Sequence, residues 1–169
     1  MQFRKATETD IGDILKIIEQ AQAYLREHGI NQWQNNYPNV ETIRQDIADG
    51  CSYVLLEGNH IAATAVISFA GEKTYASIYE GQWKTNRNYA VIHRIAVDNG
   101  QKGRGVASEM IKQAEQLCLE SNIYSIKVDT HEKNLSMQRL LQKNSFHYCG
   151  IIYLEDGDKR IAFEKLLEE

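Results

Sequence analysis

The sequence has no excess of positive charge and no long hydrophobic run, and each shortage excludes a class of protein. Its 19 Lys and Arg residues against 23 Asp and Glu residues give a net charge of −4, whereas a nucleic-acid-binding protein normally carries a basic face or a high pI. No segment approaches the ~18 consecutive apolar residues of a membrane-spanning helix, and the N-terminal residues lack the apolar stretch of a signal peptide. We therefore expect neither a nucleic acid nor a membrane as partner.

Cysteine is also scarce. Cys51, Cys118 and Cys149 are odd in number and far apart in the sequence, which argues against a disulfide framework. No Cys-x-x-Cys or His-x-x-x-His pair is present, so no metal site is expected. With no signal peptide and no membrane span, these features predict a cytoplasmic, reducing location.

What the sequence does contain is a regular succession of helical and β patterns. A length of 169 residues is usual for one domain, so we predict a single domain over residues 1–169. Apolar periodicity predicts helices near 11–29, 40–49, 106–118 and 134–143, and strands at 3–7, 52–57, 60–68, 90–97, 125–130, 146–154 and 160–166, with 71–89 ambiguous. This order predicts an α/β fold with one mixed sheet and helices on both faces. The strand at 146–154, apolar on both faces, is expected to be central.

A glycine-rich turn joins the predicted strand 90–97 to the following helix. Gly103 and Gly105 have no Cβ atom, so an anion can approach the unpaired N–H groups at the start of that helix. Lys102 and Arg104 add two positive charges to an otherwise acidic chain. These features predict a diphosphate-binding turn, and a turn that only connects the two elements is the alternative.

Two better-known phosphate motifs do not fit this turn. The Walker A motif requires Lys and Ser or Thr after its second glycine, but Val106 and Ala107 follow Gly105. The dinucleotide pattern Gly-x-Gly-x-x-Gly ends here at Ser108 instead of glycine. A dinucleotide-dependent oxidoreductase is therefore only a weak alternative.

Three segments, in the right order, resemble the GNAT superfamily of N-acetyltransferases. Lys102-x-x-Gly105-x-Ala107 is similar to the family's acyl-CoA signature, (Arg/Gln)-x-x-Gly-x-(Gly/Ala), and Arg4-x-Ala6-Thr7-x-x-Asp10 is similar to its usual opening. Asn134, followed by Leu140-Leu141-Gln142-Lys143-Asn144-Ser145-Phe146, resembles the family's Asn…Tyr-x-Lys-x-Gly-Phe segment. The resemblance implies a mixed, mostly antiparallel sheet with a central parallel βαβ unit that binds acyl-CoA.

The resemblance also implies a cosubstrate, acetyl-CoA, and no metal. The residues that would bind it are Ile95, Ala96 and Val97 along the pantetheine arm, Lys102, Gly103, Arg104, Gly105, Val106 and Ala107 at the pyrophosphate, and Asn134 from the next βα loop. His131 could line the same site, with a loop-capping role as the alternative. The implied reaction moves the acetyl group directly to a primary amine of a small molecule, peptide or protein.

One departure from the family pattern concerns the leaving thiolate. Leu141 stands where the family often has a tyrosine that protonates this group, on a helix end expected to face the thioester. Tyr124, Tyr148 or a water could serve instead, or the thiolate could leave unassisted, since a thiol of pKa ~8.5 is a tolerable leaving group. A non-catalytic acyl-CoA-binding or sensing module is the alternative function.

Amine acetylation needs the amine in its neutral form, which costs roughly 4.6 kcal/mol for an alkylammonium at pH 7. His93 is the first candidate base, because it would share a face of its strand with Ile95 and Val97. A hydrogen-bonded core histidine is the alternative. Glu80 is the second candidate base.

The polar segment around the single proline is the candidate acceptor site. Trp33 and Tyr37 could form one wall of a pocket for a small amine or a peptide end. Alternatively, Trp33 only pins this segment to the core. The sequence leaves the acceptor, the acyl-chain preference and the oligomeric state open, a homodimer included.

Overall fold

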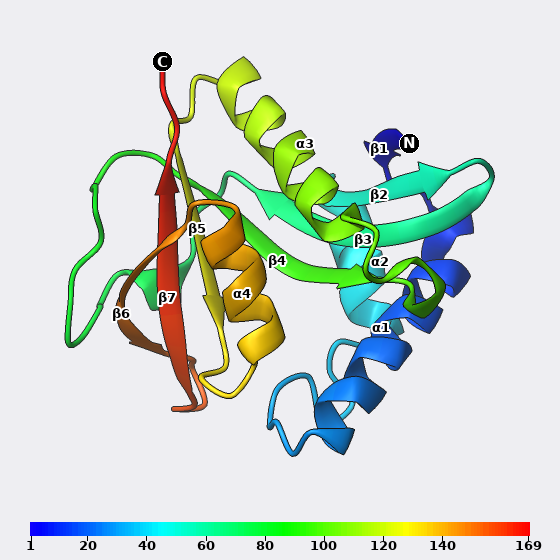
Figure 1. Ribbon diagram of the computed structural model, residues 1–169, viewed down its shortest axis with the longest axis horizontal. Coiled ribbons are helices and arrows are strands. Elements are labelled where there is room, and N and C mark those ends of the chain that lie inside the picture. Colours follow the sequence, from blue (N-terminus) through cyan, green and yellow to red (C-terminus); the bar gives the residue numbers. More distant parts are fainter. The chain divides into compact units, whose positions relative to one another are not determined.

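A computed structural model describes residues 1–169 and confirms the predicted α/β fold with a mixed sheet (Figure 1). The strands are β1 (Gln2–Lys5), β2 (Ser52–Glu57), β3 (His60–Ser68), β4 (Ala90–Val97), β5 (Ser125–Thr130), β6 (His147–Tyr153) and β7 (Lys159–Leu166). The helices are α1 (Ile11–Glu27), α2 (Val40–Ala48), α3 (Val106–Glu120) and α4 (Leu135–Lys143), with 3-10 turns η1 (Glu8–Asp10), η2 (Lys73–Tyr75) and η3 (Asn99–Gln101). The strand order is β1-β2-β3-β4-β5-β7-β6. β4 and β5 pair in parallel, whereas β1 with β2, β2 with β3, and β7 with β5 and β6 pair antiparallel.

The chain divides into two compact units, and each is described by itself. Unit 1 comprises Met1–Ile67 and His93–Gln113, and unit 2 comprises Ser68–Ile92 and Ala114–Glu169. Both β4 and α3 pass from one unit into the other. One domain over residues 1–169 stays a prediction.

In unit 1, α1 and α2 cover the β2–β3 hairpin (Figure 1). Ile14, Ile17 and Ile18 recur at helical spacing on α1 and are 2–3% exposed, so they form one apolar stripe. They pack with Ile43 of α2 against a core that includes Val54 of β2. α2 begins at the predicted place because the Asn39 side chain caps it, accepting hydrogen bonds from the N–H groups of residues 41 and 42 at 3.0 and 3.1 Å.

In unit 2, the ambiguous residues 71–89 form little regular structure and pack through aromatic side chains. Tyr75 and Val91 share a core cluster, against which Trp83 and Tyr89 also pack. Lys127, 3% exposed, has its ammonium 4.4 Å from the ring centre of Trp83 and 4.2 Å from that of Tyr89. These aromatic side chains therefore cover the sheet and a buried cation.

The position of β6 corrects one prediction. Its segment was expected to be a central strand, but β6 is the last strand in the sheet order. Its Ile151 and Ile152 are 6% and 0% exposed. Tyr79 forms an isolated antiparallel bridge to Ile151, with N–H···O distances of 2.8 Å in both directions. The segment that contains Tyr79 thus supplies hydrogen-bond partners for part of β6. This explains why an edge strand has an apolar pattern typical of a central strand.

The Thr130 side chain at the end of β5 gives a stability prediction. Thr130 is fully buried, and its hydroxyl has no hydrogen-bond partner. Thr130→Val removes a buried unsatisfied polar group at nearly constant shape, so we expect the free energy of unfolding in urea to rise by about 1 kcal/mol. Thr64→Val is the matched control: this hydroxyl is also buried but donates to the Tyr53 carbonyl at 3.2 Å. Loss of this hydrogen bond should lower the free energy of unfolding. Equal effects of the two substitutions would contradict the conclusion that the Thr130 hydroxyl is unpaired.

Candidate functional site

The turn between β4 and α3 is shaped to receive an anion. Gly103 and Gly105 have φ angles of 79° and 75°, in the left-handed region that favours glycine. A Cβ atom built on either glycine would meet no atom within 4 Å, so the space beside both is open. The Gly105 carbonyl accepts the hydrogen bond of Glu109 N–H at 3.0 Å, so α3 begins directly after Gly105. The amides of its first turn have no partner within the helix, which gives the turn the character of an anion-binding nest.

Side chains of unit 1 fix this turn to β3 and α1. The Asp98 N–H donates to the Ala62 carbonyl of β3 at 2.9 Å. The Asp98 carboxylate lies 3.0 Å from the Gln20 amide nitrogen and 3.1 Å from the His60 imidazole. Partial burial opposes ionisation of Asp98, but these hydrogen bonds outweigh it and lower its pKa. The Gln20 side-chain oxygen also accepts from Asn99 N–H at 2.8 Å, so the turn is preorganised.

Two cations lie at the rim of the same turn. The Lys102 ammonium lies 4.8 Å from the ring centre of Tyr24 on α1. An Arg104 guanidinium nitrogen donates to the Gln101 side-chain oxygen at 2.9 Å. Both residues are exposed. A diphosphate in the nest would therefore meet backbone N–H groups and two formal positive charges, so the residues present fit the predicted ligand.

The backbone of β4 is irregular directly after His93, the first predicted base. Arg94 has a φ angle of 49°, outside the extended region, so the alternation of faces does not continue through it. A shared face of His93 with Ile95 and Val97 therefore stays a prediction. Beyond the irregularity, Ala96 packs into the core formed with α1 and α2. His93 itself is half-buried and belongs to unit 1.

Glu80, the second predicted base, is an exposed residue of unit 2 with a φ angle of 54°. It follows Tyr79, whose backbone is fixed to β6. A non-glycine residue held in the left-handed region is uncommon. His93 and Glu80 thus belong to different units, and each stays a candidate on its own.

The predicted residues at the carboxyl end of β5 have structural roles within unit 2. The Asn134 side-chain oxygen accepts Met137 N–H at 3.1 Å and caps α4. The His131 Nδ1 accepts Lys133 N–H at 3.0 Å, which is the loop-capping alternative; burial and then the nearby Arg160 charge lower the pKa of His131. Contact of Asn134 and His131 with a ligand stays a prediction.

The three residues considered for the leaving group also belong to unit 2. Leu141 is 2% exposed, so its side chain packs in the protein interior. A tyrosine there would overpack the core, at a cost of about 1–3 kcal/mol. Tyr148 is 53% exposed, and the Tyr124 hydroxyl donates to the Asn122 side chain at 3.3 Å.

The predicted acceptor loop between α1 and α2 is held by packing of Trp33 and by side-chain hydrogen bonds. Trp33 packs against the unit 1 core, which supports its anchoring role, whereas Tyr37 is 45% exposed. Gln22 donates to the Pro38 carbonyl at 3.0 Å, and Gln34 donates to the Gln22 carbonyl at 3.2 Å. Trp33, Asn35 and Asn36 all have φ angles near 60°, a left-handed conformation that asparagine adopts readily and tryptophan rarely.

Sequence reasoning missed two polar clusters whose members are distant in the sequence. Arg94 pairs with Asp46 and Tyr37, which are 48 and 57 positions away. In unit 2, the Tyr75 hydroxyl donates to the Asp129 carboxylate at 2.6 Å across 54 positions. Burial raises the pKa of Asp129, and burial together with the Asp129 charge raises the pKa of Tyr75 well above its usual value. No local pattern marks either cluster.

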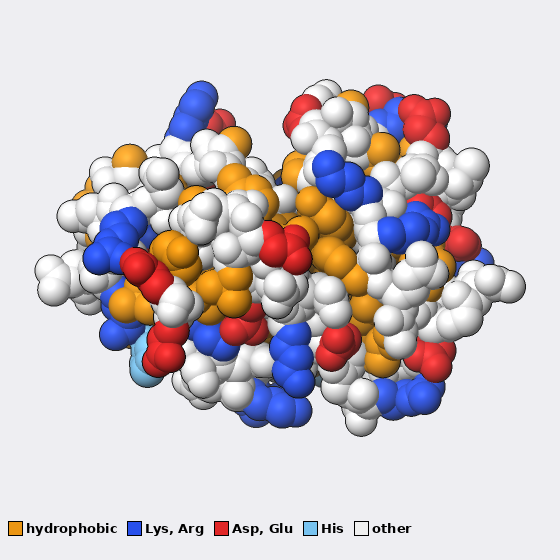
Figure 2. Space-filling view, turned by 90° about the horizontal axis from the view of Figure 1, so that it is seen from above, with side chains coloured by type: hydrophobic (Ala, Val, Ile, Leu, Met, Phe, Trp, Pro, Cys, Tyr) orange, Lys and Arg blue, Asp and Glu red, His pale blue; other side chains and the backbone are white.

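Two general features bear on possible ligands. No group of three or more His, Cys, Asp or Glu side chains lies close enough together to hold a metal ion, and no helix has both the length and the apolar character needed to cross a membrane. On the face shown in Figure 2, acidic and basic side chains are interspersed.

Comparisons with known proteins identify the family of the chain. Residues 16–146 match the model of the acetyltransferase (GNAT) family. A GNAT-family acetyltransferase from Streptococcus agalactiae is 35% identical, with 99% of this chain and 96% of that chain covered and a TM-score of 0.90. A putative acetyltransferase from Staphylococcus aureus is 25% identical, with 99% and 100% covered and a TM-score of 0.76. A GNAT-family acetyltransferase from Listeria monocytogenes, 23% identical over 98% and 94% of the two chains, shares the fold with a TM-score of 0.75. None of the curated proteins matches this sequence.

Proposed function

Because the chain belongs to the acetyltransferase (GNAT) family, we propose that it moves the acetyl group of acetyl-CoA directly to a primary amine of a small molecule, peptide or protein. Members of this family use acetyl-CoA as cosubstrate. The observation that carries the proposal is the turn after β4, where two left-handed glycines with open space beside them precede the start of α3. Its backbone N–H groups and two cations suit a pyrophosphate.

Acetyl-CoA binding is assigned to two neighbouring segments of unit 1. The N–H groups from Lys102 to Ala107 hold the pyrophosphate, and the backbone of Ile95, Ala96 and Val97 pairs with the pantetheine arm as an added strand. Asn134 is retained as a contact from the loop that follows β5. The bonds of Asp98 to Gln20 and His60 support this assignment, because they hold the turn in shape before the ligand arrives.

Acetyl-CoA supplies an acyl group activated as a thioester. The residues of this chain orient the acceptor amine and accept its proton. His93 on β4 is the proposed base, with Glu80 second. A backbone N–H of β4 near Ile95 stabilises the charge that develops on the acyl oxygen. Leu141 cannot donate a proton, so the leaving thiolate is protonated by Tyr124, Tyr148 or a water, or it leaves unassisted.

The acceptor wall is assigned to the loop containing Trp33 and Tyr37. Tyr37 offers the exposed aromatic surface, while Trp33 anchors the loop to the core. We place the protein in the cytoplasm, where acetyl-CoA is available and the three free cysteines stay reduced.

The proposal is tested with purified protein, acetyl-CoA and a panel of primary amines: polyamines, amino acid amides and peptides with free N-termini. Mass spectrometry should find one acetylated amine, and free CoA should form in equal amount. If the protein binds acetyl-CoA yet acetylates no amine in the panel, the acyl-CoA-sensing alternative holds. Stabilisation by NAD instead of acetyl-CoA in a thermal shift would favour the oxidoreductase alternative.

A further inference from the structure

We propose that Arg94 is a positioning residue that fixes the acetyl-CoA-binding end of β4 and the acceptor loop, residues 28–39, in one arrangement. Through Arg94, binding of acetyl-CoA along Ile95–Val97 is transmitted to the loop that carries Trp33 and Tyr37. The ligands named here rest on the proposed function, whereas the contacts that join the two segments are features of unit 1 itself.

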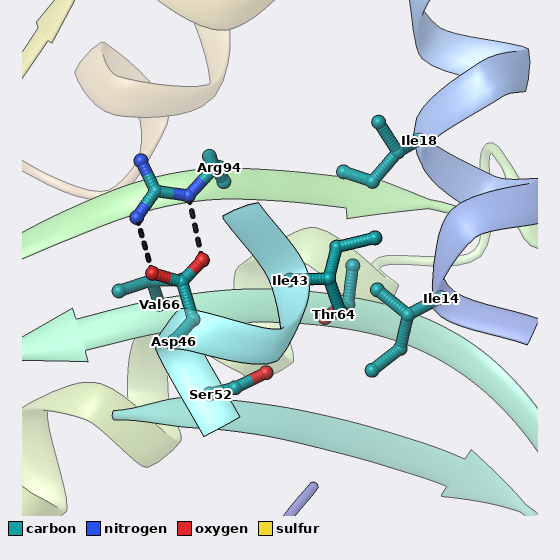
Figure 3. A pocket seen from close by; sticks show the side chains of 8 residues that line it. All are labelled: Ile14, Ile18, Ile43, Asp46, Ser52, Thr64, Val66 and Arg94. Carbon is teal, nitrogen blue, oxygen red and sulfur yellow. Dashed lines mark hydrogen bonds and ion pairs between the residues drawn. The ribbon is translucent and has the colours of Figure 1, made fainter. Parts of the chain in front are cut away.

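Arg94 makes three directional contacts with residues of two other elements. Its Nε donates to one carboxylate oxygen of Asp46 at 2.8 Å and its Nη2 to the other at 2.7 Å, as Figure 3 shows. Its Nη1 donates to the Tyr37 hydroxyl at 2.9 Å. Asp46 lies on α2 and Tyr37 in the acceptor loop. The planar guanidinium fork is suited to this bidentate geometry, which a lysine does not reproduce.

The pair is shielded from water, which makes the contacts with Asp46 strong and specific. The side chains of Arg94 and Asp46 are 18% and 11% exposed. Little solvent screens the pair, and removal of one partner leaves a poorly solvated charge. Arg94 therefore has one preferred arrangement, in contrast to the exposed Arg44–Glu41 pair on the surface of α2.

The side-chain contacts of Arg94 matter because its backbone is strained. Its φ angle of 49° is strained for a residue with a Cβ atom, and such strain persists only where the surroundings hold it. The residues directly after it, Ile95–Val97, are the ones assigned to acetyl-CoA. The bidentate pair with Asp46 thus holds the irregularity that determines how these residues present their backbone groups.

The space beside the pair indicates a positioning role and not a substrate pocket. A cavity of about 10 Å³ lies between α1, α2, β2, β3 and β4, with Asp46, Ser52, Thr64 and Arg94 contributing its polar atoms (Figure 3). This is about the space of a single water molecule. The observed partners of the guanidinium are Asp46 and Tyr37, so its proposed role runs through these two residues.

The experiment compares Arg94→Gly with Arg94→Ala. Both variants lose the side-chain contacts, but only glycine adopts a φ of 49° without strain. We expect Arg94→Ala to bind acetyl-CoA about tenfold more weakly than Arg94→Gly by calorimetry. The loop is followed separately by the ¹⁹F resonance of fluorotryptophan at Trp33, assigned with Trp33→Phe; both variants should shift or broaden it without any ligand.

Two further variants retain the Arg94 backbone and protect the test against a folding failure. Asp46→Asn keeps the shape of the partner but weakens the pair, so it should lower acetyl-CoA affinity and perturb the Trp33 resonance. Tyr37→Phe removes only the link to the loop, so acetyl-CoA should still bind while the Trp33 resonance responds to it less than in the wild type.

The outcomes separate this proposal from the proposed function. Equal acetyl-CoA affinity of the glycine and alanine variants, together with an unchanged Trp33 resonance in both and in Asp46→Asn, overturns the positioning role. If the wild-type protein does not bind acetyl-CoA, the proposed function is overturned, and so is the transmission of acetyl-CoA binding to the acceptor loop. The Trp33 resonance without ligand then still decides whether Arg94 holds the loop.

Discussion

Replacing Gly105 with valine is expected to abolish the stabilisation that acetyl-CoA gives the folded protein. A ligand at a hundredfold excess over its dissociation constant stabilises the native state by about 2.7 kcal/mol. We propose that the pyrophosphate approaches the N–H groups of the turn through the open space beside Gly105, and a branched side chain would occupy that space. The thermal midpoint of Gly105→Val should therefore not respond to acetyl-CoA, whereas that of the wild type should rise.

A second effect of this substitution has to be separated from lost binding. The φ angle of 75° at Gly105 is strained for valine, so the variant also loses some intrinsic stability. Gly58→Val is the matched control, because Gly58 has a φ angle of 61°, open space around it and a place in the β2–β3 hairpin turn. It should lose intrinsic stability too but keep the full response to acetyl-CoA. A folded Gly105→Val protein that still responds would refute the assignment of the turn.

The parts of the site that sequence could predict are those built from neighbouring residues. The turn from Lys102 to Ala107 combines a strand end, two glycines and a helix start within a few positions, and the structure places all three as expected. The cap of α2 at Asn39 is local in the same sense. Such features depend on backbone geometry that short stretches specify by themselves.

The parts that could not be predicted depend on contacts between distant segments. The left-handed conformation of Arg94 conflicts with a strand pattern, and it is accompanied by partners on α2 and in the acceptor loop. Local propensity cannot reveal such a conformation, so a count of side-chain faces by a period of two is not dependable past Arg94. Leu141 is a similar case, since a motif position says nothing about how deeply a side chain is buried.

Buried charges explain why residues 71–89 show no clear helical or strand pattern. Glu164 is fully buried and accepts hydrogen bonds from the Ser125 hydroxyl at 2.6 Å and from Lys84 N–H at 2.7 Å. Lys127 lies opposite Glu164 in the β5–β7 register, and its ammonium is 3.3 Å from the Thr85 carbonyl. Residues 71–89 thus provide partners for buried charges on the sheet. Because these contacts determine their conformation, their sequence shows neither a helical nor a strand period.

Replacing His93 with glutamine is expected to lower the turnover of the acetylation reaction on the order of 10²–10³-fold, the scale of general-base catalysis. Glutamine keeps polarity and approximate size but cannot accept the proton of the amine at neutral pH. Acetyl-CoA affinity, measured by calorimetry, should change little, because the proposed contacts of the cosubstrate use the backbone of Ile95–Val97 and the turn after it. The expected loss is therefore in kcat and not in cosubstrate binding.

The pH dependence distinguishes a base from a core histidine at this position. In the wild type, the acid limb of the kcat/KM profile should report protonation of the imidazole, because a protonated imidazole cannot accept the proton of the amine. In His93→Gln that limb should disappear, and activity should partly recover at high pH, where more of the amine is already neutral. His147→Gln serves as control, because it removes an exposed histidine of β6 and should leave both kcat and the pH profile in place. If His93→Gln unfolds the protein or keeps the wild-type profile, His93 is a structural residue, and Glu80→Gln becomes the next variant to test for a loss of turnover.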